Sequence, residues 1–542
     1  SPQLYNAEVV VTADGMVVDS LTEQFGIRSL EFSPEFGFKL NGKKIFLQGN
    51  ANHHDLGALG ATCYDKAIER MMLQLKSFGY NCIRCSHNPY SESFARIADR
   101  VGMLVVNELT DKWSDNDYWG GRQPFTHIWH KLITEWIKRD RNRPSIILWS
   151  LGNELQIREG WAGFEGTNDW GITTYNIFNQ LVKRWDHTRL TTVAMFPARA
   201  GAITRHDKEF NDYLVPPELA CATEVASFNY QSDKYDAYLK YRPDLILFQS
   251  EAETSNLLQP YYNMDRKRTV GMAYWGSAEY WGESNKWPKK GWNYSFFDHT
   301  MRPYPQAYLI KSAFMPEIPE VHIGVVDAAG AESVNWNDVI VGRMALNECW
   351  NHTPGSRRSL FTFTNAHSVE LLVNGQSMGI QKNDTTRANL RNMIYWKDVP
   401  YGNGGSVVAI ARDKSGKEVA RHRIETAGKA VALRIEAETP TDWKADGMDL
   451  QYINVTVIDK KGRPVWDYNE PLTLQMEGAA RLVALDNGDH YTDELFHGIT
   501  SKRMYQGRMQ IILRSDQEAG NVTVKISSAG LKGTLRLKTI KE

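Results

Sequence analysis

Hydrophobic and polar residues follow two different periods along this chain. Between about residues 38 and 275, short apolar runs alternate with segments of helical period. Such runs are typical of strands buried on both faces of a parallel sheet. After about residue 316 the period falls to two, which indicates antiparallel strands with one buried face. The pattern predicts an α/β domain followed by β-domains.

Eight strand-like runs lie in the α/β region, with helices predicted between most of them. The runs cover residues 44–49, 81–86, 103–106, 145–151, 190–194, 225–230, 244–250 and 269–275. Eight such units over about 270 residues match a closed (β/α)8 TIM barrel. An open doubly wound sheet would need a glycine-rich phosphate loop after the first strand, and Gly57-Ala-Leu-Gly60 does not have that spacing. We therefore predict the barrel.

The chain of 542 residues is too long for one domain. The predicted domains are the C-terminal strands of an immunoglobulin-like β-sandwich (1–34), the catalytic barrel (35–316), an immunoglobulin-like β-sandwich (317–428) and a C-terminal β-sandwich (429–542). The strands of the first region could not bury a core alone. We therefore expect that the natural protein has further N-terminal sequence.

Composition narrows the partners that the protein could have. The formal net charge of −1 gives no electrostatic case for nucleic acid or an anionic membrane, and no apolar run is long enough to span a bilayer. Cys82 and Cys85 lie in one predicted strand and point to opposite faces, so we interpret them as core residues. The five cysteines do not fix the compartment. A bacterial periplasmic or secreted location is favoured over the cytoplasm, and a homo-oligomer is left open.

Two of the apolar runs end in a glutamate. Glu154 follows the run 145–151 and Glu251 follows the run 244–250. In a barrel, catalytic groups sit at the C-terminal ends of the strands, and a buried carboxylate is costly unless it has a task. Two carboxylates facing each other are the basic equipment of a glycoside hydrolase. Either glutamate alone would be interpreted as a solvent-facing strand end, but the pair favours catalysis.

The other predicted strand ends carry polar and aromatic residues suited to a sugar. They are Asn52, His53, His54, Asp55, His87, Asn88, Glu108, Asp111, Asn153, Asn229, Tyr230 and Trp275. Asn and His can bond hydroxyls as donors and acceptors, and an indole offers a flat apolar face. Adjacent histidines diverge on an extended chain and no third ligand stands at metal spacing, so we predict no catalytic metal site. A structural Mg²⁺ or Na⁺ near Glu108 or Asp111 stays open.

Several motifs resemble glycoside hydrolase family 2, and most closely its β-galactosidase branch. They are Gly49–Gly60, Ile83–Pro89, Trp149–Glu154, Phe228–Tyr230, Ser250–Glu251 and Tyr274–Trp275, and Phe25–Arg28 resembles the junction from a preceding immunoglobulin-like domain. The resemblance implies an exo-acting retaining β-galactosidase that hydrolyses terminal non-reducing β-D-galactosyl residues through a covalent glycosyl-enzyme. It also implies that the N-terminal sugar-binding jelly roll of the family is missing from this sequence.

The resemblance also implies a role for each matching residue. Glu154 would be the acid/base, Glu251 the nucleophile, Asn153 a ligand of the 2-hydroxyl, Tyr230 an orienting donor to the nucleophile, His53 and His87 ligands of sugar hydroxyls, Trp275 part of the pocket floor, Arg84 a support beneath the nucleophile and Asn229 a further support. No cofactor is required. Where the family has a Glu and a His that hold Mg²⁺, this chain has Glu108-Leu-Thr-Asp-Lys-Trp113, which departs from the pattern.

Other functions stay open at this stage. A family 2 enzyme could act on another sugar, as a β-glucuronidase, β-mannosidase or pentopyranosidase. A glucuronidase would need cations for the substrate carboxylate, and Lys286, Lys289 and Lys290 follow the eighth strand. A non-catalytic carbohydrate-binding protein is the alternative from another class, and the two intact glutamates argue against it.

Overall fold

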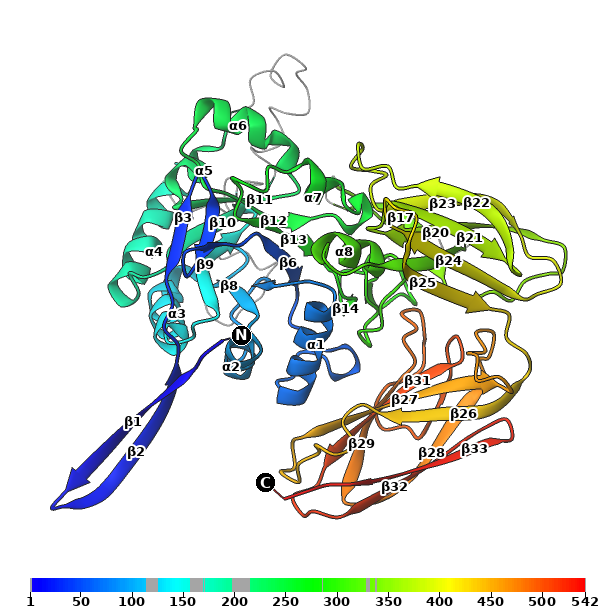
Figure 1. The fold of residues 1–542 in the computed structure, drawn as a ribbon. Coiled ribbons are helices and arrows are strands. Elements are labelled where there is room, and N and C mark those ends of the chain that lie inside the picture. Colours follow the sequence, from blue (N-terminus) through cyan, green and yellow to red (C-terminus); the bar gives the residue numbers. More distant parts are fainter. Residues whose placement is uncertain are drawn as a thin grey trace. The chain divides into compact units, whose positions relative to one another are not determined.

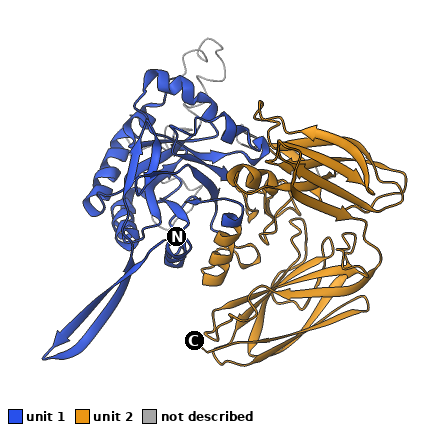
Figure 2. Cartoon of the chain, viewed as in Figure 1, with its two compact units in different colours: residues 1–54, 75–275 blue, residues 55–74, 276–542 orange. Residues whose placement is uncertain are grey.

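The computed structural model describes residues 2–113, 125–155, 169, 171–196, 215–284, 286–327, 332–336 and 339–541. The chain divides into two compact units (Figure 2). One unit is Ser1–His54 with Leu75–Trp275, and the other is Asp55–Gln74 with Gly276–Glu542. Each unit is described by itself.

The first unit contains a closed barrel of eight parallel strands among its described residues, in the order β10-β11-β12-β13-β6-β7-β8-β9 (Figure 1). The strands are β6 (Leu47–Asn52), β7 (Cys82–Cys85), β8 (Leu104–Glu108), β9 (Ile146–Asn153), β10 (Leu190–Met195), β11 (Val225–Asn229), β12 (Leu247–Ala252) and β13 (Gly271–Trp275). Every residue of β9 is buried, as the apolar runs led us to expect. The predicted (β/α)8 barrel is confirmed.

The strands extend further toward their C-terminal ends than the apolar runs do. The predicted strand 44–49 is observed as Leu47–Asn52, and the strand predicted at 244–250 is observed as Leu247–Ala252. Asn52 still pairs with Cys85, and Glu251 pairs with Asn229. Backbone pairing does not depend on side-chain hydropathy, so polar residues such as Asn52 and Glu251 are held on the rigid sheet. His53, Glu154 and Tyr230 follow directly after strand ends, and His87 lies two positions after the end of β7.

The described α-helices lie between or after the barrel strands along the chain. They are α1 (Asp65–Ser77), α2 (Glu92–Val101), α3 (Phe125–Asp140), α4 (Ile172–Trp185), α5 (Glu218–Ala222), α6 (Tyr235–Tyr241), α7 (Gln259–Asn263) and α8 (Ala307–Phe314). Helix α2 shows why they begin and end where they do. The Ser91 hydroxyl accepts the Phe94 N–H at its start, and Gly102 ends it in the left-handed conformation. None of the described helices is long and apolar enough to cross a membrane.

Short antiparallel strands precede the barrel. They are the hairpin β1 (Tyr5–Ala13) and β2 (Met16–Phe25), followed by the three-stranded sheet of β3 (Leu30–Ser33), β4 (Gly37–Leu40) and β5 (Lys43–Lys44). Asp14 and Gly15 both have positive φ in the hairpin turn, as a two-residue turn of this kind requires.

The second unit contains two β-sandwiches, as predicted. One pairs the sheet β19-β16-β20-β23 with β22-β21-β24-β25, and the other pairs β26-β27-β31-β29 with β30-β28-β32-β33. Each has its own apolar core, with fully buried Trp350 in the first and Trp443 in the second. The fold class predicted from the sequence is confirmed.

The strand bounds of the second unit complete the description. The first sandwich has β16 (Val321–Val326), β19 (Leu346–Asn347), β20 (Arg357–Thr364), β21 (Ser368–Val373), β22 (Gln376–Lys382), β23 (Met393–Pro400), β24 (Ser406–Arg412) and β25 (Glu418–Glu425). The second has β26 (Ala430–Ala437), β27 (Leu450–Asp459), β28 (Pro471–Gly478), β29 (Ala480–Asp486), β30 (Ser501–Arg503), β31 (Arg508–Ser515), β32 (Asn521–Ser528) and β33 (Leu531–Lys538). Smaller pairs are β14 (Tyr280–Trp281) with β15 (Gly291–Trp292), and β17 (Glu332–Trp336) with β18 (Val339–Arg343).

Candidate active site

The two glutamates lie at the C-terminal ends of barrel strands. Glu251 is part of β12 and is 3% exposed, whereas Glu154 directly follows β9 and is only half-buried. Both strands lose regular register at this point, between β11 and β12 and between β9 and β10. Irregularities of this kind re-aim side chains and are frequent beside active sites.

Two residues of this region have an uncommon backbone conformation. Glu154 has φ of 52° and Tyr230 has φ of 60°. A non-glycine residue in the left-handed region costs on the order of 1 kcal/mol or more and persists only when its surroundings hold it. Backbone bonds hold both, because Glu154 N donates to Ala194 O and Tyr230 N donates to Glu251 O, each at 2.7 Å. The fold therefore fixes the direction in which each side chain leaves the barrel rim.

Glu251 receives a donor on each carboxylate oxygen. Arg84 Nη1 donates to Oε1 at 2.6 Å, and the Tyr230 hydroxyl donates to Oε2. Arg84 comes from β7 and is fully buried. Burial alone would lower the pKa of Arg84, but Glu108 and Glu251 raise it above its ordinary value. The permanent positive charge stabilises the ionised form of Glu251.

Glu108 holds Arg84 in place through hydrogen bonds. Its Oε2 accepts Arg84 Nε at 3.0 Å, Arg84 Nη2 at 2.7 Å and the Ser150 hydroxyl at 2.6 Å. Its Oε1 lies 2.6 Å from His87 Nδ1. Burial raises the pKa of Glu108, while Arg84 acts against that increase. With both oxygens engaged, Glu108 positions Arg84 and His87.

Glu108 and Asp111, at the end of the third barrel strand, do not fit the Mg²⁺ site that other members of the family have there. Both oxygens of Glu108 are engaged by Arg84, Ser150 and His87, and Asp111 Oδ1 accepts Lys112 Nζ at 2.6 Å and Asn153 Nδ2 at 3.1 Å. A cation here would have to displace these donors. The absence of a cofactor requirement stays a prediction.

A chain of hydrogen bonds connects the two glutamates through two asparagines. From the Glu251 side, Arg84 Nη2 donates to Asn153 Oδ1 at 2.9 Å. Asn229 Nδ2 lies 3.0 Å from both Asn153 Oδ1 and Glu154 Oε1, and Asn229 Oδ1 accepts the Ser250 hydroxyl at 2.7 Å. The two carboxyl groups therefore belong to one buried polar network, in which a change at one group affects the other.

The two glutamates favour different protonation states. Burial, together with the negative charge of Glu251, raises the pKa of Glu154 to about 8, whereas Lys112 and Asn229 act in the opposite direction. At neutral pH Glu154 therefore holds a proton. Glu251, paired with Arg84, carries the negative charge. Two carboxyl groups whose surroundings favour opposite states are the arrangement needed for one acid and one nucleophile.

An aromatic cluster lies beside the carboxyl groups. The rings of His87 and Trp275 stack at 5.2 Å, and His53 meets Trp275 edge-on at 5.1 Å and His87 edge-on at 5.6 Å. Burial lowers the pKa of His87 to about 3. The neutral ring donates from Nδ1 to Glu108, which leaves Nε2 as an acceptor 3.3 Å from Asn153 Nδ2. Such a cluster provides a flat apolar surface with a polar edge, which suits a pyranose.

Comparison with known proteins agrees with this geometry. Residues 35–270 match the family model described as "Glycosyl hydrolases family 2, TIM barrel domain", and residues 433–535 match "Glycoside hydrolase family 2 C-terminal domain 5". The chain belongs to glycoside hydrolase family 2. A third model, described as a domain of unknown function, matches residues 355–420 of this family 2 chain.

Relatives within family 2 carry two different activity names. The chain is 27% identical to a Bacteroides ovatus protein named beta-galactosidase BoGH2A, over 98% of this chain and 66% of that protein. It is 24% identical to a Bacteroides fragilis protein named beta-glucuronidase, over 76% of this chain and 58% of that protein. It spans between about half and two thirds of the length of the curated relatives that it matches first.

A solved family 2 structure has the same architecture. The crystal structure of a glycosyl hydrolase family 2 member from Bacteroides cellulosilyticus has a TM-score of 0.86 and 28% identity. The match covers 99% of this chain and 68% of that one. The described residues therefore share the fold of about two thirds of that family 2 protein.

The structure brings together the nine residues to which the family resemblance gave a role. Arg84, His87, Asn153, Glu154, Asn229, Tyr230 and Glu251 are joined by hydrogen bonds, and His53 and Trp275 are joined to His87 by ring contacts. Sequence analysis missed the anchoring role of Glu108 and the contributions of Ser150 and Ser250. Both serines lie inside otherwise apolar strand runs, and a polar hydroxyl at such a position could have marked them as part of the site.

The turn before Glu154 gives a direct test of how tightly the site is held. A Cβ at Gly152 would lie 2.8 Å from Nε1 of Trp113, whose indole is 1% exposed and donates to Leu151 O at 2.7 Å. We predict that Gly152→Ala destabilises the fold by about 1–3 kcal/mol and lowers kcat more than it changes KM. Urea unfolding and steady-state kinetics measure the two effects. Gly428→Ala is the matched control for steric clash, because a Cβ there meets no atom closer than 3.4 Å and the residue has no positive φ.

Proposed function

We propose that this chain catalyses retaining, exo-acting hydrolysis of terminal β-D-galactosides. The observation that carries the proposal is one hydrogen-bonded network that joins two carboxyl groups in different surroundings. Burial and the charge of Glu251 raise the pKa of Glu154, whereas the two oxygens of Glu251 receive donors from Arg84 and Tyr230. Retaining glycosidases need one protonated carboxyl and one carboxylate nucleophile.

In the first step, a Glu251 oxygen attacks the anomeric carbon and forms an ester bond to the sugar. The bond from that carbon to the leaving oxygen breaks, and the Glu154 proton passes to the leaving oxygen. The Arg84 and Tyr230 donors fix the direction of attack, because each holds one oxygen of Glu251. The product of this step is a covalent glycosyl-enzyme with an ionised Glu154.

In the second step, Glu154 accepts a proton from water, which attacks the same carbon and breaks the ester. The ester carries no charge, so the electrostatic contribution of Glu251 to the pKa of Glu154 disappears while the intermediate exists. Glu154 is then a carboxylate when a base is needed. Its partial exposure leaves a path for water, which the fully buried Arg84 side of the network does not offer.

Sugar recognition is assigned to the aromatic cluster and Asn153. His87 Nε2 is an acceptor for a hydroxyl of the sugar, and the Asn153 amide adjoins it at 3.3 Å. Trp275 lies under His87 and closes this side of the pocket. In this proposal Asn153 bonds the 2-hydroxyl, and His53 binds a second hydroxyl.

The second candidate is hydrolysis of β-glucuronides. It is favoured by relatives named beta-glucuronidase, one of them from Streptococcus agalactiae with 35% identity over 29% of this chain. Two of the three lysines considered for the substrate carboxylate already share a carboxylate of this chain, since Lys286 and Lys289 lie 3.5 and 3.6 Å from Glu332. Glu332 offsets part of their charge and competes with a substrate carboxylate for both, and so we place the galactoside first.

A panel of p-nitrophenyl glycosides tests the sugar. We expect kcat/KM for the β-D-galactoside to exceed that for the β-D-glucuronide, β-D-mannoside and β-D-xyloside by at least about 10-fold, which is the discrimination that about 1.4 kcal/mol provides. Fastest turnover of the glucuronide would replace the galactoside assignment. A 2-deoxy-2-fluoro-β-galactoside with a dinitrophenyl leaving group should add one sugar mass to Glu251. Failure of both turnover and labelling with every sugar would favour a non-catalytic carbohydrate-binding protein.

A further inference from the structure

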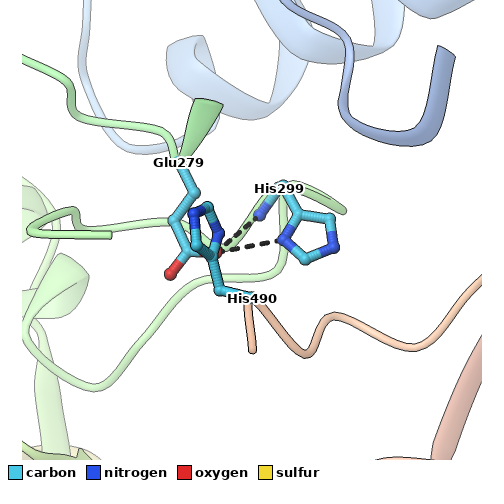
Figure 3. A group of neighbouring side chains, drawn as sticks. All are labelled: Glu279, His299 and His490. Carbon is cyan, nitrogen blue, oxygen red and sulfur yellow. Dashed lines mark hydrogen bonds and ion pairs between the residues drawn. The ribbon is translucent and has the colours of Figure 1, made fainter. Parts of the chain in front are cut away.

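Two buried histidines of the second unit, His299 and His490, face the same carboxylate oxygen of buried Glu279 (Figure 3). Glu279 Oε2 lies 3.1 Å from His299 Nδ1 and 3.1 Å from His490 Nδ1. The three residues are 2%, 4% and 3% exposed. Glu279 and His299 come from the segment that follows the barrel strands, whereas His490 lies between β29 and β30 of the C-terminal sandwich. The cluster thus joins distant parts of the sequence, and its three residues do not form a short sequence motif.

The hydrogen bonds of His299 leave a conflict. Its Nε2 lies 2.8 Å from Asp486 Oδ1, so this nitrogen carries a proton that it donates to the carboxylate. In a neutral imidazole the other nitrogen, Nδ1, then has a lone pair and no proton. That lone pair faces the oxygen of Glu279. Two acceptors at 3.1 Å repel each other unless a positive charge lies between them.

Neither neutral tautomer of His490 satisfies both of its ring nitrogens. If its Nδ1 donates to Glu279, its Nε2 is a buried acceptor that has no hydrogen-bond partner among the described residues. If Nε2 carries the proton, Nδ1 faces Glu279 as a second unprotonated acceptor. The ring cannot turn away easily, because Trp281 stacks against it at 5.1 Å. Each tautomer leaves one polar atom unsatisfied, which is costly in a buried site.

We propose that Glu279, His299 and His490 bind a divalent transition metal ion of the Zn²⁺ class. Two imidazole nitrogens and one carboxylate oxygen are a ligand set that zinc uses in proteins. Bonds of 2.0–2.1 Å in a tetrahedron place ligand atoms about 3.3 Å apart, close to the two separations of 3.1 Å. A metal removes both conflicts, since each Nδ1 lone pair and the Glu279 oxygen then point at the cation.

The surroundings resemble the outer shell of a metal site. Asp486 fixes the tautomer and the orientation of His299, as carboxylates do for metal-bound histidines. The Tyr304 hydroxyl donates to Oε1 of Glu279 at 2.7 Å, whereas Oε2, which faces both histidine rings, accepts one long backbone bond from His299 N at 3.3 Å. A cavity of about 20 Å³ is lined by Glu279, His299 and Asp486. This space, which His490 does not line, has room for one water molecule beside the cluster.

A second histidine–glutamate cluster in the same unit differs in the protonation of His422, the histidine that accepts a backbone N–H, and serves as an internal control. His322 Nε2 lies 2.8 Å from Glu348 Oε1, and His422 Nε2 lies 3.9 Å from the same oxygen. His422 Nδ1 accepts the N–H of Ile323 at 3.1 Å, so Nε2 carries its proton and faces the carboxylate without conflict. No metal is proposed there.

The site would act on stability, independently of the proposed glycosidase. It would connect the loop after β29 to the segment after the barrel strands, and metal bound only by the folded chain stabilises it by mass action. The competing explanation is that the positive charge comes from a proton, with His299 or His490 present as a buried imidazolium. The two explanations differ in their response to added metal.

The test uses the full chain, stripped of metal by a chelator and then titrated with Zn²⁺ or Co²⁺. We expect a single bound ion per chain by native mass spectrometry, the ligand-field absorption of tetrahedral Co²⁺, and a rise in Tm of at least about 2–4 °C. His490→Ala and Glu279→Gln should lose the absorption and the Tm rise, whereas His422→Asn should keep both. Asp486→Asn should weaken binding about 10–100-fold.

Two results would overturn the proposal. One is a folded, stripped wild-type chain that shows neither Co²⁺ absorption nor a Tm change with either metal. The other is metal binding that survives intact in His490→Ala. If that variant does not fold, the Asp486→Asn titration and the wild-type Co²⁺ spectrum decide. Glycosidase activity enters none of these measurements, so failure of the proposed function would leave the result unaffected.

Discussion

Replacing Glu251 with alanine is expected to abolish β-glycoside turnover, with a fall in kcat on the order of 10⁴- to 10⁶-fold, as for other nucleophiles. The substitution removes the attacking oxygen and leaves Arg84 Nη1 without its carboxylate partner. It also creates space on the α face of the sugar. Azide should enter this space, attack the anomeric carbon directly and yield an α-linked glycosyl azide. Product analysis by nuclear magnetic resonance identifies the anomer.

Glu253→Gln is the matched control for Glu251→Ala. Glu253 lies two positions further along the chain, points to Asn256 Nδ2 at 3.0 Å and makes none of the bonds of the site. We expect its kcat to stay within about two-fold of wild type, because the substitution keeps the shape of this half-buried side chain and leaves both donors to Glu251 in place. Glu251→Gln, which keeps the shape of the side chain, shows whether any loss of Tm comes from the missing charge. Azide restoring turnover through a β-linked product in Glu251→Ala would show that another group is the nucleophile.

Much of the fold could be predicted from the sequence, because buried parallel strands leave a strong hydropathy signal. The run before Glu154 and the run before Glu251 marked β9 and β12 correctly. The ends of the strands were less predictable. Asn52 and Glu251 belong to the sheet through backbone pairing with neighbouring strands, and the hydropathy of a polar side chain carries no information about that pairing.

The candidate site was only partly predictable. The glutamates followed from their positions after apolar runs, whereas the roles suggested for Arg84 and Tyr230 depended on the family resemblance. Glu108 was considered as a cation ligand, and the structure shows it bonded to Arg84 instead. That contact joins β7 to β8 within the closed barrel. Which side chains meet inside a barrel depends on register and strand tilt, which a single sequence does not specify.

The cluster around Glu279 was missed for a related reason. Sequence analysis looked for histidines at metal spacing and considered only the neighbouring pair His53 and His54. His299 and His490 stand almost two hundred residues apart and meet at Glu279 only through tertiary structure. Spacing motifs detect ligands that share one helix or turn, and this group shares neither.

Replacing Glu154 is expected to separate the two chemical steps. In Glu154→Ala, substrates with a poor leaving group should lose about 10²- to 10⁴-fold in kcat/KM, the usual contribution of a general acid. Dinitrophenyl glycosides need no proton on the leaving oxygen, so they should still form the glycosyl-enzyme. That intermediate should accumulate and be released by azide as the β-linked glycosyl azide. A rapid burst of dinitrophenol, measured in a stopped-flow instrument, would detect it.

The pH profile gives an independent measure of the same group. Burial and Glu251 raise the pKa of Glu154 to about 8, so the proton needed for catalysis is present below that pH and is lost as the pH rises through it. Wild-type kcat/KM for a substrate with a poor leaving group should therefore fall above about pH 8. Glu154→Gln cannot lose a proton, so its low residual activity should show no such decline. If the decline persists in Glu154→Gln, another group supplies the proton, and Glu154 would then owe its raised pKa to its surroundings without acting as the acid.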